Sequence, residues 1–486
     1  MAQSNLEFKT IKKIHEAYNA KKVSPLELTQ DFFKSIKASK HNAYLTVCEE
    51  RALGQAKAAT QTLSKSGKVP SDQFPLFGIP LGLKDVLTLD GVRTTCASKI
   101  IENYIPPYTA TAVERLEKAG SITLGKLNMD EFAMGGSNEN SAFGPVLHPT
   151  HEGYVPGGSS GGSATAVKAG LCVAALGTDT GGSVRLPASY CGVVGLKPTY
   201  GRVSRYGLVA FASSLDQIGP LTHDTEDAAR ILDVMSGHDP KDSTSAAMPK
   251  SQVLKAMTTA PDWSKVKIGV PKEYSVGGLS PDVEKSLQES LKWFEKKGAK
   301  LIPISLPHTK YAVAIYYIVA VSEASSNLAR FDGVRFGVRP KDADQSPDLP
   351  TFYKRVRSNF GPEVKRRIIL GTFALSSGYY DAYYRRACQV RRLVKQDFEK
   401  AFSQVDVIIS PVSPSTAFKL GEKSKDPIKM YLNDIFTIPV NLAGLPAMSV
   451  PCGQDHKGLP IGLQFTTPAF QEEKLFSMAH AFEVRT

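Results

Sequence analysis

The sequence of 486 residues does not carry the signals of several protein classes. Its six cysteines are scattered, and none of them lies in a CxxC pair. Cys452 and His456 are four residues apart, but no second ligand pair accompanies them, which argues against a zinc site. We therefore expect no bound metal, and we expect reduced thiols that pack as small apolar side chains.

Membrane and targeting signals are also absent from the sequence. No apolar run reaches the ~18 residues that cross a bilayer. The longest run, 311–321, is closed by Lys310 and Glu323 and predicts a buried helix. The N-terminus has neither a signal peptide nor the Arg-rich, acid-poor composition of a transit peptide, because the first arginine is Arg51. These features predict a cytoplasmic protein with no membrane contact.

Acidic residues are scarce in one basic stretch, 354–395, of a chain whose formal net charge is +12. Only Glu363 and Asp381 oppose the basic residues of this stretch. The basic residues are Lys354, Arg355, Arg357, Lys365, Arg366, Arg367, Arg385, Arg386, Arg391, Arg392 and Lys395. Two interpretations stay open: the stretch faces a polyanion such as tRNA, or it is a solvated helix face whose arginines bind substrate or internal partners.

The order of apolar segments predicts an α/β fold around one large, mainly buried sheet. Two helices open the chain, at 25–40 and 49–65, and the first has a capping box of Ser24 and Glu27. No repeat with a period of 20–50 residues is present, so we expect one compact domain and no solenoid. The other expected elements are strand 78–84, helix 111–118, strand 122–126, helix 163–169, strand 172–177, strand 266–270, helix 280–297 and strand 301–304.

Two loops rich in glycine and serine, 156–163 and 177–185, mark the candidate site. Glycine lets backbone N–H groups approach an anion or a developing oxyanion. A flexible linker is out of place in this apolar region, and neither loop has the Gly-Lys-Ser/Thr ending of a phosphate loop. A serine nucleophile is the third interpretation. Residues 157–161 fit the G-x-S-x-G elbow of α/β-hydrolases, but they do not follow a buried strand.

A serine nucleophile needs a base, and Lys84 is the candidate. It ends the apolar segment 78–84, where burial lowers the pKa of an amine and makes it usable as a base near neutral pH. An ion pair between Lys84 and Asp85, or another carboxylate, is the competing interpretation. The histidines of the chain stand in no distinctive context, so a Ser–His pair is not indicated.

Lys84 and the two loops together resemble the amidase signature family. Residues 177–188 read Gly-Thr-Asp-Thr-Gly-Gly-Ser-Val-Arg-Leu-Pro-Ala, and the match continues through 191–199. The resemblance implies one domain, 1–486, with a mixed central sheet covered by helices on both faces. Its implied parts are an N-terminal helical region at 1–70, a signature core at 77–220, and an elaborated second half at 221–486 that supplies substrate-binding residues.

The resemblance also implies a role for each residue of the site. Ser183 is the nucleophile, and Ser159, held through a cis peptide, passes its proton to Lys84. A serine hydroxyl of ordinary pKa is a poor nucleophile, so this relay to a neutral amine activates it. No metal is needed for this step. The implied oxyanion hole consists of the backbone N–H groups of Thr180, Gly181, Gly182 and Ser183.

Segments outside the signature resemble the glutaminase subunits, or A subunits, of tRNA-dependent amidotransferases. These segments are 322–333, 378–384 and 431–439. The resemblance implies that Arg367 binds the α-carboxylate of glutamine, Asp434 binds its α-amino group, and Tyr317 is a flanking contact. Arginine suits a carboxylate because its planar fork donates two parallel hydrogen bonds. Arg366 and Tyr316 are adjacent alternatives.

The same resemblance implies a larger reaction. The chain would hydrolyse glutamine and release ammonia to a B subunit, which uses ATP and magnesium to amidate Glu-tRNA(Gln) or Asp-tRNA(Asn). A small C subunit would complete the heterotrimer, and no cofactor is expected in this chain. Two alternatives stay open: a stand-alone amidase of the family that acts on other small amides, and a non-catalytic member that binds tRNA or acts as a scaffold.

Overall fold

A single mixed sheet runs through the protein. The computed structural model describes residues 9–274, 278–423 and 426–485. In this described part, eleven strands form one sheet in the order β1-β3-β2-β4-β6-β5-β10-β11-β9-β7-β8. Parallel pairs, such as β2 with β4, occur beside antiparallel pairs, such as β10 with β11, so the expected mixed sheet is confirmed. The strands are β1 (Tyr44–Val47), β2 (Pro80–Lys84), β3 (Ile122–Leu127), β4 (Ala174–Asp179), β5 (Val194–Lys197), β6 (Gln217–Thr222), β7 (Lys267–Pro271), β8 (Lys300–Ile304), β9 (Val407–Pro411), β10 (Ala447–Gln454) and β11 (Pro460–Thr466).

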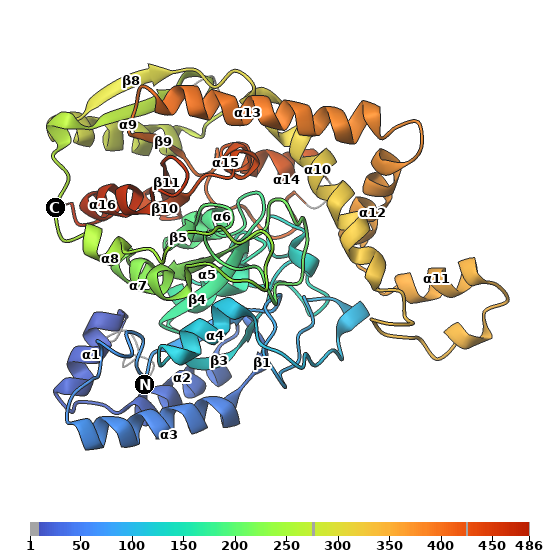
Figure 1. Ribbon diagram of the computed structural model, residues 1–486, viewed down its shortest axis with the longest axis horizontal. Helices are drawn as coiled ribbons and strands as arrows, with labels where there is room; N and C mark the ends of the chain where they lie inside the picture. The colour runs from blue at the N-terminus through green and yellow to red at the C-terminus, as the bar shows by residue number, and fades with distance from the viewer. Residues whose placement is uncertain (1–8, 275–277, 424–425, 486) are drawn as a thin grey trace.

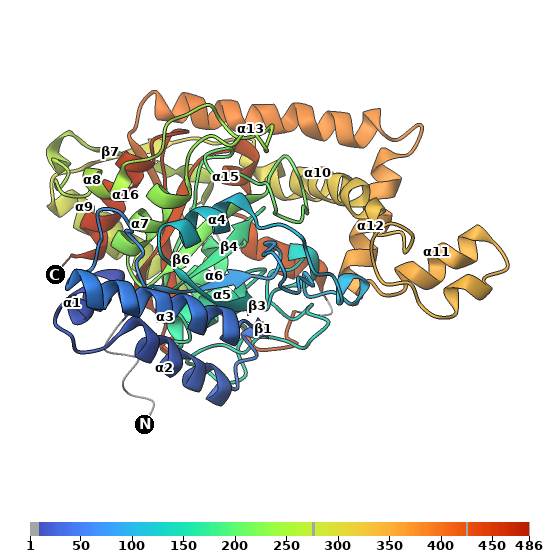
Figure 2. The same ribbon diagram turned by 60° about the horizontal axis from the view of Figure 1, so that its bottom comes forward.

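Helices flank this sheet, as expected. Figures 1 and 2 show α1, α2 and α3 together beside the β1 edge, while α9 lies at the opposite end, beside β8. The helices are α1 (Ile11–Asn19), α2 (Pro25–Ala38), α3 (Glu49–Ser66), α4 (Thr111–Lys118), α5 (Gly161–Lys168), α6 (Arg185–Cys191), α7 (Thr225–Met235), α8 (Val253–Ala256), α9 (Pro281–Lys296), α10 (Ala312–Asn327), α11 (Leu349–Arg357), α12 (Pro362–Leu375), α13 (Arg386–Phe402), α14 (Pro427–Tyr431), α15 (Ile438–Ala443) and α16 (Glu472–Glu483).

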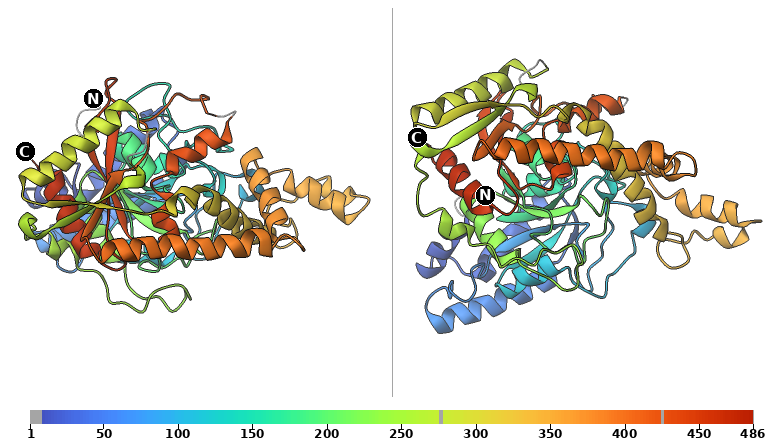
Figure 3. Two further views of the ribbon diagram at one scale, coloured as in Figure 1. Left: turned by 90° about the horizontal axis from the view of Figure 1, so that it is seen from above. Right: turned by 45° about the horizontal axis from the view of Figure 1, so that its top comes forward.

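One helical extension belongs to the second half of the chain. Helices α10 and α12 pack against each other, and α11 projects from the body beyond them (Figures 1 and 3). With its flanking turns, α10 covers Thr309–Arg330, which by length and composition alone could cross a membrane. Half of its apolar window is buried inside the protein, and α10 packs on α12, α13 and α15. The apolar run 311–321 thus forms a helix packed within the protein, as expected, but one that is only half buried.

Within residues 9–70, three helices are accompanied by one strand that the sequence-based expectation did not include. Between α2 and α3, the chain forms β1, which pairs antiparallel with β3. Its residues are Tyr-Leu-Thr-Val, and aromatic and β-branched side chains favour strands. In this edge strand the residue types and the pairing with β3 both favour extended backbone, although the elements before and after it in sequence are helices.

The other expected elements are confirmed, with their ends shifted by at most two residues. Helix α4 has the expected bounds, and α3 is capped by Gly67 in the left-handed conformation, with φ 69°. The helix expected to begin at Ser163 begins at Gly161 instead. Glycine is a poor helix former. However, a Cβ on Gly162 would overlap the backbone of Asn128, so close packing requires glycine in this first turn.

Helix α2 begins with the capping box that its sequence predicts. The Glu27 N–H donates to Ser24 Oγ over 3.2 Å, and the Ser24 N–H donates to the Glu27 carboxylate over 2.8 Å. Helix α9 also begins with serine and proline, but its Ser280 makes no side-chain bond to the first turn in the described structure. Both serines therefore occupy the N-cap position of a helix, but only the Ser24 side chain stabilises its first turn.

Ser24→Ala should loosen the first turn of α2, whereas Ser280→Ala should leave that of α9 nearly unchanged. A lost side-chain cap costs about 1 kcal/mol, which corresponds to about fivefold faster amide exchange in that turn. Hydrogen–deuterium exchange followed by mass spectrometry measures both variants. Equal acceleration in the two helices would contradict this difference.

Candidate functional site

Lys84 lies at the buried centre of a cluster of hydroxyl groups. It is the last residue of β2, which lies between β3 and β4, and its side chain is fully buried. Its Nζ lies 2.7 Å from Ser159 Oγ, 2.9 Å from Ser160 Oγ and 2.9 Å from Thr178 Oγ1. The Gly158–Ser159 peptide bond is cis, as the resemblance implies. The sheet thus brings Lys84 and Ser159 into direct contact.

Burial determines the charge of Lys84. Desolvation lowers the pKa of its amine from 10.5 to about 7, although the carboxylates of Asp130 and Asp179 oppose the shift. At this pKa the amine is half neutral near pH 7. A neutral amine 2.7 Å from Ser159 Oγ can accept a proton from that hydroxyl.

Asp85, the residue after Lys84, is engaged with other groups. Its carboxylate lies 2.9 Å from Lys126 Nζ, and both side chains are fully buried. It also accepts hydrogen bonds from the N–H and the hydroxyl of Thr95. The competing interpretation, an ion pair between Lys84 and Asp85, is therefore wrong.

The two loops rich in glycine and serine pack against each other. The Ser160 N–H donates to the Ser183 carbonyl over 3.2 Å. Ser159 and Ser160 lie just before α5, and Ser183 lies just before α6. Ser183 keeps 8% of its surface exposed, whereas Ser159 and Ser160 keep none. Of these three serines, only Ser183 keeps any exposed surface.

Glycines in the second loop let side chains from the second half of the chain approach closely. A Cβ on Gly181 would overlap the ring of Tyr316, and a Cβ on Gly182 would overlap Thr437 Oγ1 and the Asp434 carboxylate. Thr437 Oγ1 also donates to the Gly181 carbonyl over 2.7 Å. The loop whose N–H groups are expected to bind an oxyanion therefore lies directly against residues expected to bind substrate.

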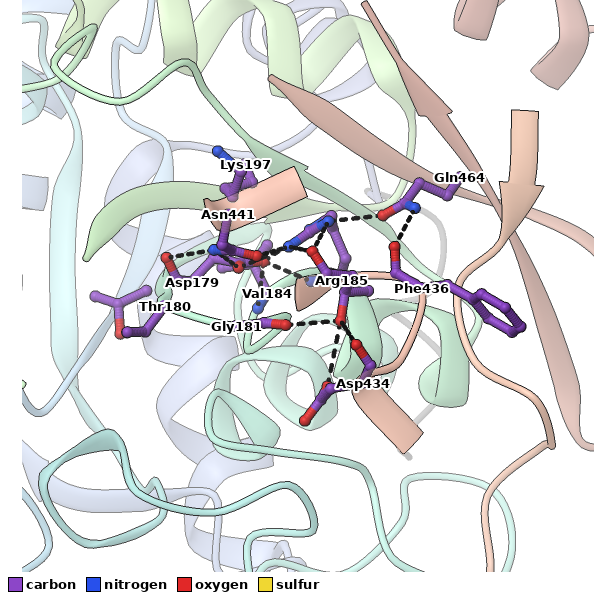
Figure 4. Close-up of polar contacts among 12 residues, drawn as sticks. Asp179, Thr180, Gly181, Val184, Arg185, Lys197, Asp434, Phe436, Asn441 and Gln464 are labelled. Carbon is purple, nitrogen blue, oxygen red and sulfur yellow. Dashed lines mark hydrogen bonds and ion pairs between the residues drawn. The ribbon is translucent and has the colours of Figure 1, made fainter. Parts of the chain in front are cut away.

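Arg185 anchors the same loop to the C-terminal half of the chain (Figure 4). Its guanidinium donates to both carboxylate oxygens of Asp179 over 3.0 and 2.9 Å, and to Gln464 Oε1 over 2.7 Å. It also donates to the Thr437 carbonyl over 3.2 Å, and Asn441 bonds to both Asp179 and Arg185. Burial would raise the pKa of Asp179, but the Arg185 charge lowers it to about 2, so this carboxylate stays ionised.

A cavity of about 150 Å³ brings the three expected glutamine-binding residues together. Tyr317, Arg367 and Asp434 all line it. The Arg367 Nε donates to the Glu363 carboxylate over 2.8 Å, and its guanidinium lies 5.3 Å from the centroid of the Tyr317 ring. Tyr317 stacks on Tyr431 at 3.8 Å between ring centroids. The cavity is smaller than the ~300 Å³ or more of drug-sized ligand sites and suits a small polar molecule.

Asp434 lines the cavity and also contacts the second loop. Burial raises the pKa of its carboxyl to about 8, and the negative charge of Asp179 adds to the shift. An ammonium group in the cavity would favour the ionised carboxylate. The adjacent alternatives are also placed: Arg366 lines the cavity but is partly exposed, whereas Tyr316 lies against Gly181. The choice of Arg367 and Tyr317 stays a prediction that fits this cavity.

Several residues of the site were not foreseen from the sequence. Ser160 and Thr178 share the amine of Lys84 with Ser159, and Glu363 orients Arg367. Ser160 directly follows Ser159, and Glu363 precedes Arg367 by four residues on one helix. These two spacings could have pointed to Ser160 and Glu363 from the sequence alone. The position of Thr178 depends on the pairing of β4 with β2, which no local pattern encodes.

One trio of possible metal ligands lies elsewhere. Asp282, Asp455 and His456 offer ligand atoms within 4.8 Å of one another. His456 Nδ1 lies 2.7 Å from the Asp282 carboxylate, and Thr416 donates to Asp455 over 2.8 Å. These groups already have partners in the protein. The expectation that no metal takes part stays a prediction.

The structure thus places a buried lysine in contact with the Ser159 hydroxyl on a mixed α/β sheet. The sequence matches the Amidase family over residues 27–476, and the chain belongs to this family. It is 54% identical to the A subunit of glutamyl-tRNA(Gln) amidotransferase from Geobacter metallireducens over 479 residues, which cover 98% of this chain and 97% of that protein. It is 55% identical to the protein of the same name from Halalkalibacterium halodurans, with the same coverage.

Solved structures of the family have the same fold. The crystal structure of the A subunit of glutamyl-tRNA(Gln) amidotransferase from Thermotoga maritima has a TM-score of 0.79 at 43% identity, covering 98% of this chain and 94% of that chain. The peptide amidase of Stenotrophomonas maltophilia has a TM-score of 0.80 at 28% identity, covering 98% and 96% of the two chains.

The reactivity of Ser183 should depend on the charge of Lys84. Since the lysine pKa is lowered to about 7, the amine becomes protonated below that pH and cannot accept a proton. The rate of Ser183 labelling by a sulfonyl fluoride should rise through an apparent pKa of about 7 and fall about tenfold per pH unit below it. Mass spectrometry of the labelled peptide measures this rate. Lys84→Arg, which stays charged, should label slowly at every pH, and a wild-type profile without an inflection between pH 6 and 8 would contradict the account.

Proposed function

We propose that the chain is the glutamine-hydrolysing subunit of a tRNA-dependent amidotransferase. The observation that carries this proposal is the contact between Lys84 and Ser159: the fully buried Lys84 Nζ lies 2.7 Å from Ser159 Oγ. The second loop lies beside this pair. Asp434 contacts that loop and also lines the cavity that contains Arg367. Relatives that are 54% and 55% identical over nearly the whole chain are named as A subunits of glutamyl-tRNA(Gln) amidotransferases. The function is the hydrolysis of glutamine to glutamate and ammonia.

Proton transfer starts the proposed reaction. Ser183 Oγ attacks the side-chain amide carbon of glutamine and gives its proton to Ser159 Oγ, which gives its own proton to the neutral amine of Lys84. The backbone N–H groups of Thr180 and Gly181, with those of the following two residues, hold the negative charge of the carbonyl oxygen. The C–N bond then breaks as the proton returns to the leaving nitrogen, and ammonia departs. Water hydrolyses the acyl-enzyme and restores the Ser183 hydroxyl.

Substrate choice follows from the charges of the cavity. Arg367 binds the α-carboxylate of glutamine, Asp434 binds the α-ammonium group, and Tyr317 flanks the substrate. Glu363 and the tyrosine rings around Arg367 hold its guanidinium in place. With both charged ends fixed, the side-chain amide of glutamine extends toward the second loop, because Asp434 lies against Gly182 of that loop.

The partner subunits supply the rest of the proposed reaction. A B subunit uses ATP and magnesium to activate the tRNA-bound amino acid of Glu-tRNA(Gln) or Asp-tRNA(Asn), and ammonia from this chain then forms the amide. A C subunit completes the heterotrimer, which acts in the cytoplasm. The names of the relatives support this assignment, because each of them is one subunit of an amidotransferase.

A stand-alone amidase is the second candidate function. The similar fold of the peptide amidase from Stenotrophomonas maltophilia is the observation that favours it. The charged cavity of about 150 Å³ disfavours it, because bulky apolar amides offer no partner for Arg367 or Asp434. Ammonia release from glutamine, compared with release from aliphatic and aryl amides, separates the two functions. Faster turnover of the apolar amides by the isolated chain would favour the stand-alone enzyme.

Ser183→Ala should abolish glutamine hydrolysis, because it removes the attacking oxygen. Loss of such a nucleophile lowers kcat by about 10³-fold or more. Ammonia release measured by a coupled glutamate dehydrogenase assay checks this, with Ser403→Ala, an exposed serine outside the site, as the matched control. Near-normal turnover by Ser183→Ala would mean that another group is the nucleophile.

Glutamine binding should release a proton from Asp434. Burial raises the pKa of this carboxyl to about 8, so it is mostly protonated at pH 7, whereas the bound ammonium group requires the carboxylate. Affinity for glutamine should therefore rise with pH up to about 8, and fall up to tenfold per unit below it. Titration calorimetry of Ser183→Ala in two buffers of different ionisation enthalpy measures the released proton. Asp434→Asn in the same background should bind weakly and release none, and proton-free binding at pH 7 by the chain with Asp434 intact would contradict this account.

A further inference from the structure

One buried carboxylate, that of Asp130, lies between the Lys84 cluster and the glutamine cavity. Asp130 comes three residues after the end of β3, and its side chain is fully buried. Its Oδ2 accepts the Asn138 N–H over 2.9 Å, and its Oδ1 accepts the Asn140 N–H over 3.0 Å. Hydrogen bonds to an ionised carboxylate are stronger than those between neutral groups. Residues 135–140, which we call the cavity segment, are therefore held by this one side chain.

The cavity segment forms part of the wall of the glutamine cavity. All of its residues except Asn138 line the cavity. A Cβ on Gly136 would come within 3.8 Å of the Asp434 carboxylate, so the segment lies close to a residue expected to bind substrate. A shift of the segment would therefore change the space in which glutamine binds.

The Asp130 carboxylate also lies against the loop that carries Ser159. A Cβ on Gly158 would overlap this carboxylate, so only glycine fits at that position. The Gly158 N–H donates to the Gly136 carbonyl over 2.9 Å, and the Asp130 N–H donates to the Ser159 carbonyl over 3.2 Å. Asp130 thus connects the cavity segment to the serine that contacts Lys84.

The negative charge of Asp130 acts on Lys84 as well. Burial raises the pKa of the Asp130 carboxyl to about 6, although its two backbone N–H donors and Lys84 oppose the rise, and Glu139 adds to it. The group is therefore mostly ionised above pH 7. Desolvation lowers the pKa of Lys84, and the groups that oppose this shift are, largest first, Asp130, Asp179, Asp216 and Cys96.

Asp130 acts through other groups and not on the substrate itself. Within the described residues, its carboxylate oxygens accept from backbone N–H groups of the cavity segment, and they bond to no hydroxyl of the Lys84 cluster. The side chain has no exposed surface. It can therefore fix the positions of other groups and bias their charge, but it does not contact the reacting atoms.

We propose that Asp130 is a positioning residue for glutamine hydrolysis, whose carboxylate holds the cavity segment against the Ser159 loop and presents a fixed negative charge to Lys84. This inference rests on the proposed function, because it concerns the site where glutamine would bind. One side chain then anchors a wall of the substrate cavity, the bridging serine and the charge of the base. Catalysis is sensitive to misplacements of about 1 Å, so loss of this anchor has a measurable cost.

The first test measures glutamine affinity in the Ser183→Ala background. Asp130→Asn keeps the shape of the side chain, but it removes the charge and replaces one acceptor oxygen by an N–H donor. One N–H of the cavity segment then loses its partner, and the dissociation constant of glutamine should rise about tenfold or more in titration calorimetry. The amides of Asn138 and Asn140 should also exchange with deuterium faster than in wild type.

Asp233→Asn is the matched control for this test. The Asp233 carboxylate accepts the N–H groups of Val253 and Leu254 over 2.9 and 3.0 Å, and it does not line the glutamine cavity. The control therefore loses the same kind of bond at a different place, and its glutamine affinity should match that of Ser183→Ala alone. Unchanged affinity in the Asp130→Asn variant would overturn the inference.

The second test needs no glutamine. Without the Asp130 charge, the protonated form of Lys84 is less favoured, and the pKa of Lys84 should fall below its value of about 7. At pH 6, Ser183 labelling by a sulfonyl fluoride, relative to its own plateau rate, should be at least about twofold faster in Asp130→Asn than in wild type. Asp233→Asn should keep the wild-type profile. An inflection at the wild-type pH or above in Asp130→Asn would overturn the inference, because a purely structural side chain would lower the plateau without moving the inflection.

A second variant separates the position of the carboxylate from its charge. Asp130→Glu keeps the charge but lengthens the side chain, and Gly135 and Gly158 lie too close to the carboxylate to leave room for it. It should weaken glutamine binding and keep the wild-type labelling inflection. Wild-type glutamine affinity in this variant would overturn the inference even if Asp130→Asn fails to fold. If wild type binds no glutamine, the proposed function fails, whereas the deuterium exchange and the labelling profile still decide the role of Asp130.

Discussion

The burial of a single amine, that of Lys84, is the constraint on which the rest of the site depends. Its nearest polar partners are the hydroxyls of Ser159, Ser160 and Thr178, and desolvation lowers its pKa to about 7. The cost of burying an unpaired charge is thereby avoided, because the amine sheds its proton near neutral pH. Asp85, which could have neutralised Lys84 as a cation, is held by Lys126. Lysine is usually a solvated cation, but burial at this position makes the Lys84 amine a base.

The two halves of the chain meet at the second loop, and each half is incomplete without the other. The first half supplies Lys84 and the serines, whereas the second half supplies Arg367 and Asp434 to a cavity that Gly135 and Asn140 of the first half also line. Arg185 crosses this boundary by joining Asp179 to residues of the C-terminal half, which fixes the loop relative to the cavity (Figure 4). Helix α12 extends the connection outward, because one side holds Arg367 and the other side carries exposed apolar side chains.

Much of the fold could be predicted from the sequence, because short apolar segments alternate with well-capped helices. Helix α4 and the start of α2 follow local rules, and the structure has them where those rules place them. Strand β1 has strand-forming residues, but its pairing with β3 is a long-range choice that neighbouring helix signals hide. The same division holds for the site. Lys84 and the serines lie in recognisable motifs, whereas the closeness of Thr178 and Asp130 to Lys84 depends on strand order and loop packing.

Neutron diffraction from crystals of this chain, grown near pH 8, tests the central claim most directly, because it locates the deuterons on Lys84 Nζ. The account predicts a neutral amine with two deuterons, and a Ser159 hydroxyl whose deuteron lies on the line to Nζ. Three deuterons on Nζ at that pH would show that burial does not make Lys84 a base, and would contradict the mechanism.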